Sequence, residues 1–141
     1  MSKSHKSENS RILITDTPDR IHKKVMGAVT DSTNSVSYEP VARPGVANLL
    51  HLLSFLDEAN NRTTPEELAQ SLARQGATLG QLKQLVSNKI ITKLGGIRER
   101  YIRLLSEDDG RYIDFVAEDG ARRAREIAEE TMAIVRSAIG L

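Results

Sequence analysis

Two capping boxes in the middle of the chain constrain its fold more strongly than any other feature of the sequence. In the first, Thr64 is followed three residues later by Glu67, and in the second Thr78 is followed by Gln81. The threonine hydroxyl and the acidic or amide side chain satisfy backbone N–H groups that the first turn of a helix leaves unpaired. A helix is therefore predicted to begin at each box.

Two prolines mark earlier helix starts. Thr17-Pro18 places a capping hydroxyl before a proline at the first helical position, and this helix is predicted to run to about Thr30. Pro44 opens a second helix, which we interpret as the central core helix because apolar residues cover most of its sides. Its apolar stripe consists of Val46, Leu49, Leu50, Leu53 and Leu56.

A polar loop is predicted between these two helices, from Asp31 to Arg43, because this segment is rich in Ser, Thr and Asn. A short extended piece is expected inside it, at Val36 to Tyr38. Asp31 and Asn48 are interpreted as turn and cap residues. His51, in the apolar helix, is expected to be partly buried and hydrogen-bonded.

The last third of the chain contains further helical segments with glycine breaks. The helix that begins at Leu79 is predicted to break or bend at Gly95-Gly96, and Asp108-Asp109-Gly110 is predicted to form a turn. A short helix is expected at residues 112–116, followed by a long helix with a seam of small residues from Ala121 to Ala138. We interpret the seam as a packing face within the domain, with a dimer seam as the alternative.

Composition favours a single all-α domain. The 141 residues are 39% hydrophobic, mostly aliphatic, and only 4% are aromatic, which suits packed helices better than a β-sandwich. We predict an all-α helical bundle. Residues 1–16 are expected to form a flexible loop and linker, and residues 17–141 one compact helical unit.

Charge and residue content exclude several classes of site. The net charge of +1 gives no strong overall attraction to nucleic acid, so RNA contacts would need local basic patches. The sequence contains no cysteine, and His5, His22 and His51 are too scattered to indicate a metal site. The longest apolar stretch is too short to span a bilayer, and we expect no membrane association.

Several short segments, in order, resemble one enzyme family. Met1-Ser2-Lys3-Ser4 matches the last four residues of the Lys-Met-Ser-Lys-Ser signature of class I aminoacyl-tRNA synthetases. At approximately the family's spacing there follow Thr30-Asp31-Ser32, the run from Pro44 to Leu50, the run from Ile97 to Tyr101, and Gly120-Ala121. Together they are similar to the bacterial and mitochondrial type of tryptophanyl-tRNA synthetase. The resemblance covers essentially the whole chain and implies the carboxy-terminal, anticodon-side helical domain.

The chain departs from the family pattern at three places. The lysine that opens the signature is missing because the sequence starts at Met1, and His5-Lys6 replaces the usual Asp-Pro. Gly96 stands where a proline commonly precedes the Ile-Arg-Glu-Arg segment. The first two departures weaken the inferred geometry of the loop, and the third suggests a softer helix junction.

The resemblance implies an ATP-binding role for Met1, Ser2, Lys3 and Ser4, with Lys3 as the catalytic group. In the family, tryptophan and ATP form an adenylate and pyrophosphate, and the amino acid then passes to tRNA. An ammonium group held near the departing phosphates stabilises their growing negative charge. In this chain alone a lysine at a disordered end is not preorganised, so we interpret Lys3 there as solvated.

Arginines are the candidate contacts to tRNA phosphates. Arg98, Arg100 and Arg103 form one group, and Arg122, Arg123 and Arg125 form another. Interspersed glutamates make a solvated, salt-bridged helix face the alternative for each of them. Tyr101 and Tyr112 could stack on a base, but their spacing with Ile97, Leu104 and Val116 favours core packing.

The family resemblance also implies partners and a location. The parent enzyme would use ATP with Mg²⁺, tryptophan and tRNA(Trp), and would form a homodimer, whereas this chain is expected to be monomeric and to bind no cofactor tightly. The nucleotide-binding half lies upstream in the family, so the isolated chain is expected to be inactive. A non-catalytic tRNA-binding module and a protein-interaction bundle are the rival functions. The Ser-rich segment after the signature favours the mitochondrial matrix, with a bacterial cytoplasm as the alternative.

Overall fold

The computed structural model describes residues 7–57 and 63–140, and all regular structure in these ranges is helical. The predicted all-α class is therefore confirmed. None of the described helices combines the length and apolar character that a bilayer-spanning helix needs. In chain order the elements are η1 (Glu8–Ser10, a short 3-10 helix), α1 (Pro18–Met26), α2 (Pro44–Leu56), α3 (Pro65–Arg74), α4 (Leu79–Ser106), η2 (Glu107–Gly110, also 3-10) and α5 (Arg111–Ile139).

The helix starts follow the sequence signals. The Thr64 hydroxyl accepts a hydrogen bond from the N–H of Glu67, whose carboxylate accepts one from the N–H of Thr64, so this capping box is complete. The second box is equivalent, because Gln81 and Thr78 exchange the same two hydrogen bonds at 2.8 and 3.2 Å. Pro18 and Pro44 occupy the first turns of α1 and α2, as predicted.

Helix α1 is shorter than expected. It ends at Met26, not near Thr30, and the N–H of Gly27 bonds back to the carbonyl of Lys23 to close the last turn. The ammonium of Lys83 in α4 donates hydrogen bonds to the carbonyl oxygens of Met26 and Ala28, at 3.2 and 2.8 Å. These carbonyls are satisfied by a side chain, so the helix stops without leaving them unpaired.

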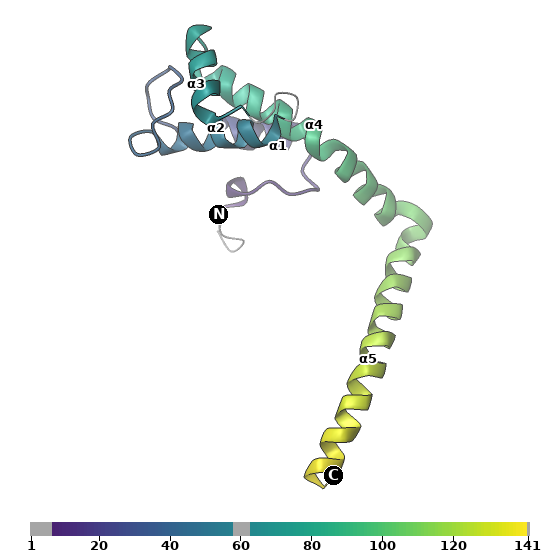
Figure 1. The fold of residues 1–141 in the computed structure, drawn as a ribbon. Helices are drawn as coiled ribbons and strands as arrows, with labels where there is room; N and C mark the ends of the chain where they lie inside the picture. The colour runs from purple at the N-terminus through teal and green to yellow at the C-terminus, as the bar shows by residue number, and fades with distance from the viewer. Residues whose placement is uncertain (1–6, 58–62, 141) are drawn as a thin grey trace. The chain divides into compact units, whose positions relative to one another are not determined.

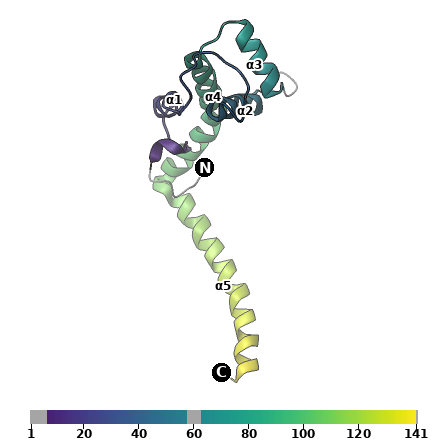
Figure 2. The same cartoon turned by 90° about the vertical axis from the view of Figure 1, so that its left-hand side faces the viewer.

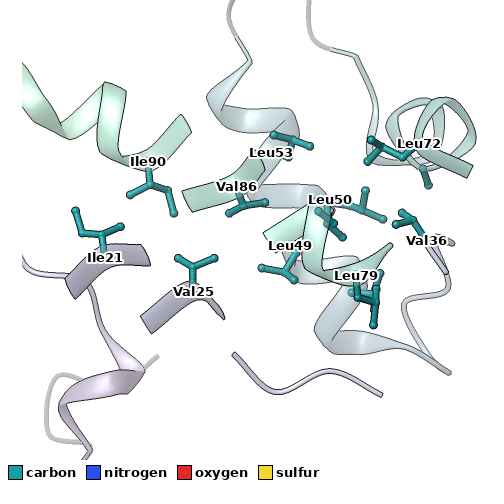
Figure 3. Close-up of a cluster of buried hydrophobic side chains, with 13 residues drawn as sticks. Ile21, Val25, Val36, Leu49, Leu50, Leu53, Leu72, Leu79, Val86 and Ile90 are labelled. Atoms are coloured by element: carbon teal, nitrogen blue, oxygen red, sulfur yellow. The ribbon is translucent and has the colours of Figure 1, made fainter. Parts of the chain in front are cut away.

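Four helices contribute to one hydrophobic core. Figure 3 shows Ile21 and Val25 of α1 beside Val86 and Ile90 of α4 and Leu49 of α2, with Leu72 of α3 on the other side of the cluster. Helix α2 is central, as predicted, although its Phe55 is 82% exposed. Val36 closes the core from the loop, where no strand forms within the described residues. The buried apolar cluster comprises Ile21, Val25, Val36, Val46, Leu49, Leu50, Leu53, Ala69, Leu72, Leu79, Leu82, Val86 and Ile90.

The described chain divides into two compact units, and not the single unit that was expected. The first unit comprises residues 7–98 and the second residues 99–140, apart from the gap at 58–62. Figures 1 and 2 show α1, α2, α3 and the beginning of α4 gathered in the first unit. Asp16 is buried in the first unit and Ile12 packs against its core, so residues on the amino-terminal side of α1 contribute to this unit.

The predicted break at the glycine pair and the separate short helix of the last third do not form. Helix α4 continues through Gly95 and Gly96, because a glycine in a helix interior costs about 1 kcal/mol relative to alanine and does not by itself break the helix. The turn at Asp108 to Gly110 is confirmed, with all three residues at positive φ. Residues 111–139 then form the single helix α5 (Figure 1), without the expected interruption.

The second unit has no buried core among its described residues. Helix α5 contains no buried residue, so its small-residue seam does not serve as a packing face inside the second unit. Tyr101 and Tyr112, which we expected in a core, are 40% and 53% exposed. The periodicity gives these helices an apolar face, and within the second unit itself the described residues of that face are not buried.

Candidate functional site

The predicted ATP-binding residues, Met1, Ser2, Lys3 and Ser4, lie outside the described residues, and their roles stay predictions. The expectation of a flexible signature loop also falls there. What the structure describes is the segment that follows them, residues 8–16, which we call the anchor segment. It consists of η1 and an irregular stretch that leads into α1.

A buried carboxylate joins the anchor segment to α1. Asp16 is 1% exposed, and its Oδ2 atom lies 2.5 Å from the Nζ atom of Lys24, whose side chain is 5% exposed. The same oxygen accepts a hydrogen bond from the N–H of Leu13 at 2.8 Å, and the N–H of Asp16 donates to the carbonyl of Leu13. Arg20 adds a third charge, with its Nε atom 3.5 Å from Oδ1.

Burial and hydrogen bonding oppose each other at this carboxyl group. Desolvation alone would raise the pKa of Asp16, because it disfavours the charged form. The N–H of Leu13, the hydrogen bond from Lys24 and the positive charges of Lys24 and Arg20 lower the pKa more, so it falls below its ordinary value. Asp16 is therefore an ionised carboxylate that α1 holds in place.

A second ionic cluster fixes the loop between α1 and α2. Arg43, at the start of α2 and 8% exposed, donates hydrogen bonds to both carboxylate oxygens of Asp31 at 2.9 Å. It also donates to the Ser37 hydroxyl at 2.6 Å and to the Thr33 carbonyl at 2.8 Å. The hydrogen bond from Arg43 lowers the pKa of Asp31 to about 2, against the opposing effect of desolvation.

Close packing of backbone sets the position of α2 beside this loop. A Cβ atom at Gly45 would lie 2.4 Å from the carbonyl oxygen of Val29, which is closer than non-bonded atoms approach. Asn34 accepts a hydrogen bond from the N–H of Leu79 at 3.2 Å and so ties the loop to the start of α4. Asp31 acts as the turn residue that was predicted, because its carboxylate also accepts from the N–H of Thr33.

The candidate tRNA-contacting arginines differ in their surroundings. Arg98 is half-buried, and its Nε atom has no hydrogen-bond partner among the described residues, whereas Arg100 and Arg103 are exposed. Arg122 pairs with Asp119 at 2.7 Å and with Glu126 at 2.8 Å, and Arg123 pairs with Asp119 at 2.5 Å. The salt-bridged alternative therefore describes the surroundings of Arg122 and Arg123.

The two histidines that the structure describes make hydrogen bonds to nearby side chains. His22 Nδ1 lies 3.2 Å from the Ser87 hydroxyl, and His51 Nε2 lies 2.9 Å from the Tyr38 hydroxyl. His51 is exposed, so its expected partial burial is wrong, and its ring stacks on Phe55 with a centroid distance of 6.5 Å.

Comparison with known proteins identifies the family. A family described as tRNA synthetases class I (W and Y) matches residues 1–95. The chain belongs to this family. Among curated class I synthetases, the tryptophan–tRNA ligase of Rickettsia conorii is 36% identical over 99% of this chain and 40% of its own length. Tryptophan–tRNA ligase 1 of Streptomyces coelicolor is 38% identical over 100% of this chain and 39% of its own length.

A solved synthetase structure has the same fold. The crystal structure of tryptophanyl-tRNA synthetase from Mycoplasma pneumoniae matches all of this chain and 40% of its own chain, with a TM-score of 0.61 and 25% identity. The family predicted from the sequence is thereby confirmed. The chain spans about two fifths of the length of these synthetases.

The sequence analysis missed the buried charges of the first unit. Lys24 lies between Ile21 and Val25 on the face of α1 that the apolar spacing assigns to the core, and a lysine in such a stripe indicates a buried partner. Arg43 directly precedes the proline of α2, a position from which a side chain can reach the preceding loop. Neither signal identifies the acidic partner, because Asp16 and Asp31 are brought close only by the fold.

Proposed function

We propose that these 141 residues are part of a tryptophan–tRNA ligase and supply the helical portion that follows its ATP-binding signature. The observation that carries this proposal is the alignment of tryptophan–tRNA ligases over 99–100% of the chain, at 32–38% identity. The all-helical fold supports it, since the matched synthetase structure shares that fold over the whole chain.

The proposed reaction joins tryptophan to tRNA(Trp) in two steps. The carboxylate of tryptophan first attacks the α-phosphorus of ATP, which arrives with Mg²⁺, so that tryptophanyl-adenylate forms and pyrophosphate leaves. A hydroxyl of the terminal ribose of the tRNA then attacks the tryptophanyl carbonyl, and AMP leaves. Lys3 would stabilise the charge on the leaving phosphates, with Ser2, Ser4 and the backbone amides of Met1 to Ser4 as hydrogen-bond donors. Arg98, Arg100 and Arg103, with Arg122 and Arg123, are the proposed phosphate contacts to tRNA.

Three further properties belong to this proposal. The complete ligase is proposed to be a homodimer, while the 141-residue chain is proposed to be monomeric and to catalyse neither step by itself. Its proposed location is the mitochondrial matrix, supported by the Ser-rich segment after the signature. The matched relatives named above are bacterial, which supports a bacterial cytoplasm as the alternative.

A chimeric enzyme tests the function directly. The 141 residues replace the aligned part of the Bacillus subtilis tryptophan–tRNA ligase, to which they are 32% identical over their whole length. The chimera is expected to exchange pyrophosphate into ATP when tryptophan is added and to charge tRNA(Trp). The 141-residue chain alone is the control and is expected to show neither activity. A folded chimera that performs no tryptophan-dependent exchange contradicts the proposal.

The rival non-catalytic functions give different results in the same experiment. An RNA-binding module would give a 141-residue chain that binds tRNA(Trp) with strong salt dependence, together with a chimera that is inactive. A protein-interaction bundle would give neither tRNA binding nor chimera activity.

A further inference from the structure

A buried ion pair attaches the anchor segment to α1, at a position where apolar side chains could also have made the contact. Asp16 and Lys24 are both almost completely buried, 2.5 Å apart, and Leu13 donates its N–H to the same carboxylate oxygen. Two charges lose their hydration in such a site, so a buried pair contributes little net stability compared with well-packed apolar side chains. The pair instead fixes one position of the anchor segment on α1, because any arrangement that separates Asp16 from Lys24 leaves a buried charge unpaired.

A second attachment lies on the same helix. Arg20 reaches two acidic residues of the anchor segment, with one guanidinium nitrogen 3.1 Å from Glu8 and another 3.5 Å from Asp16. The N–H of Arg20 is held by the Thr17 hydroxyl at the start of α1. Helix α1 therefore binds the anchor segment near its beginning, at Glu8, and at its end, at Asp16.

We propose that Asp16 and Lys24, assisted by Arg20, are positioning residues for the ATP step. They fix the anchor segment on α1, and in the sequence this segment follows closely after residues 1–4, the signature. An ammonium group stabilises a leaving phosphate effectively only when its position is fixed before the reaction. This inference rests on the proposed function, and it assigns the buried pair no contact with ATP.

The positioning role has a local consequence in the 141-residue chain. The substitution Lys24→Met removes the charge and keeps a similar chain length, so the anchor segment should detach from α1 while the core of α2, α3 and α4 stays folded. Hydrogen exchange of the Leu13 and Asp16 amides is expected to accelerate by at least about tenfold, without change at core amides. Lys23→Met is the matched control, because Lys23 is its exposed neighbour on the same helix.

The functional consequence is measured in the chimera. Lys24→Met is expected to lower kcat for tryptophan-dependent pyrophosphate exchange by about tenfold or more, with the KM for tryptophan unchanged. Lys23→Met should stay within about twofold of the unsubstituted chimera. Asp16→Asn should resemble Lys24→Met, and the double variant should be no worse than the poorer single variant, because the two residues act as one unit.

The outcomes separate this inference from the proposed function. An inactive unsubstituted chimera contradicts the proposed function, and the hydrogen-exchange measurement then still decides whether the pair holds the anchor segment. Unchanged exchange at Leu13 and Asp16 overturns the inference. It is overturned equally if Lys24→Met lowers the melting temperature but leaves kcat unchanged at a temperature where the variant is folded, because the pair is then structural only.

Discussion

The guanidinium of Arg43 donates hydrogen bonds to both carboxylate oxygens of Asp31, each at 2.9 Å, and so connects the start of α2 to the loop that precedes it. Planar, two-point pairing of this kind fixes orientation as well as distance. The other N–H groups of Arg43 donate hydrogen bonds to the Ser37 hydroxyl and the Thr33 carbonyl. One side chain therefore holds three separate positions of this loop, Asp31, Thr33 and Ser37.

Replacing Arg43 by lysine should destabilise the first unit. A lysine has one ammonium group and cannot reproduce the two-point bond to Asp31 together with the bonds to Ser37 and Thr33. The expected decrease in Tm is about 4–8 °C, followed by circular dichroism on heating. Arg11→Lys, at a half-buried arginine of the anchor segment, is the comparison and should lower Tm less. An Arg43→Lys variant with unchanged Tm would contradict the role assigned to the guanidinium.

Stability should fall on acidification through the range set by Asp31. Its pKa is about 2 in the folded protein, against an ordinary value of 3.8, so the folded state holds the carboxylate ionised more strongly than the unfolded state does. The ion pair therefore stabilises the fold above about pH 4, and this contribution disappears as the pH falls towards about 2. Asp16, with its pKa also lowered, adds a contribution of the same sign.

Urea denaturation at a series of pH values measures this effect. The denaturation midpoint is expected to decrease between about pH 4 and about pH 2, and the decrease should be smaller in Asp31→Asn, which has no carboxyl group to protonate. Asp19→Asn, in the first turn of α1, serves as an exposed acidic control. An Asp31→Asn variant with the full acid sensitivity of the parent chain would show that another group dominates.

Two glycine-to-alanine substitutions should change stability in opposite directions. In Gly45→Ala the new methyl group would lie 2.4 Å from the Val29 carbonyl oxygen, so α2 must shift, at a cost of about 1–3 kcal/mol. In Gly95→Ala the methyl group meets nothing within 4 Å in a helix interior, and stability should increase by about 0.5–1 kcal/mol. Equilibrium urea unfolding distinguishes the two, and destabilisation by both would contradict the packing described at Gly95.

Exposed and paired arginines should contribute differently to tRNA binding. Arg100 and Arg103 are exposed and have no ion-pair partner within the described residues, whereas the charges of Arg122 and Arg123 are already paired with Asp119 and Glu126. Removing Arg100 and Arg103 together should weaken binding and reduce the salt slope by about 1 for each phosphate that is no longer neutralised. Removing Arg122 and Arg123 should have the smaller effect.

Filter binding of tRNA(Trp) at several salt concentrations tests this comparison, with the chimera as the protein. Circular dichroism of each double variant controls for folding. Equal salt slopes in both double variants would mean that ion pairing does not decide which arginines contact phosphate.

The sequence by itself determined where the helices of the first unit begin, since capping hydroxyls, prolines and partner side chains act within one turn of the chain. Thr64 with Glu67 and Thr78 with Gln81 are such local pairs, and both form as predicted. The apolar spacing in the second helix likewise predicted the buried residues around Leu50. The order of short motifs was sufficient to identify the family.

Tertiary structure decided what depends on contacts between residues far apart in the sequence. Helix α1 stops at Met26, where Gly27 closes the turn and Lys83, from α4, satisfies the carbonyls of Met26 and Ala28. The division at residue 98, the exposure of α5 and the pairing of Arg43 with Asp31 are equally invisible to local periodicity. A helical pattern shows which face of a helix is apolar, but only the packed structure determines what, if anything, covers that face. For the same reason Lys24 could be recognised as a lysine in an apolar stripe, while its partner Asp16 was determined by the fold alone.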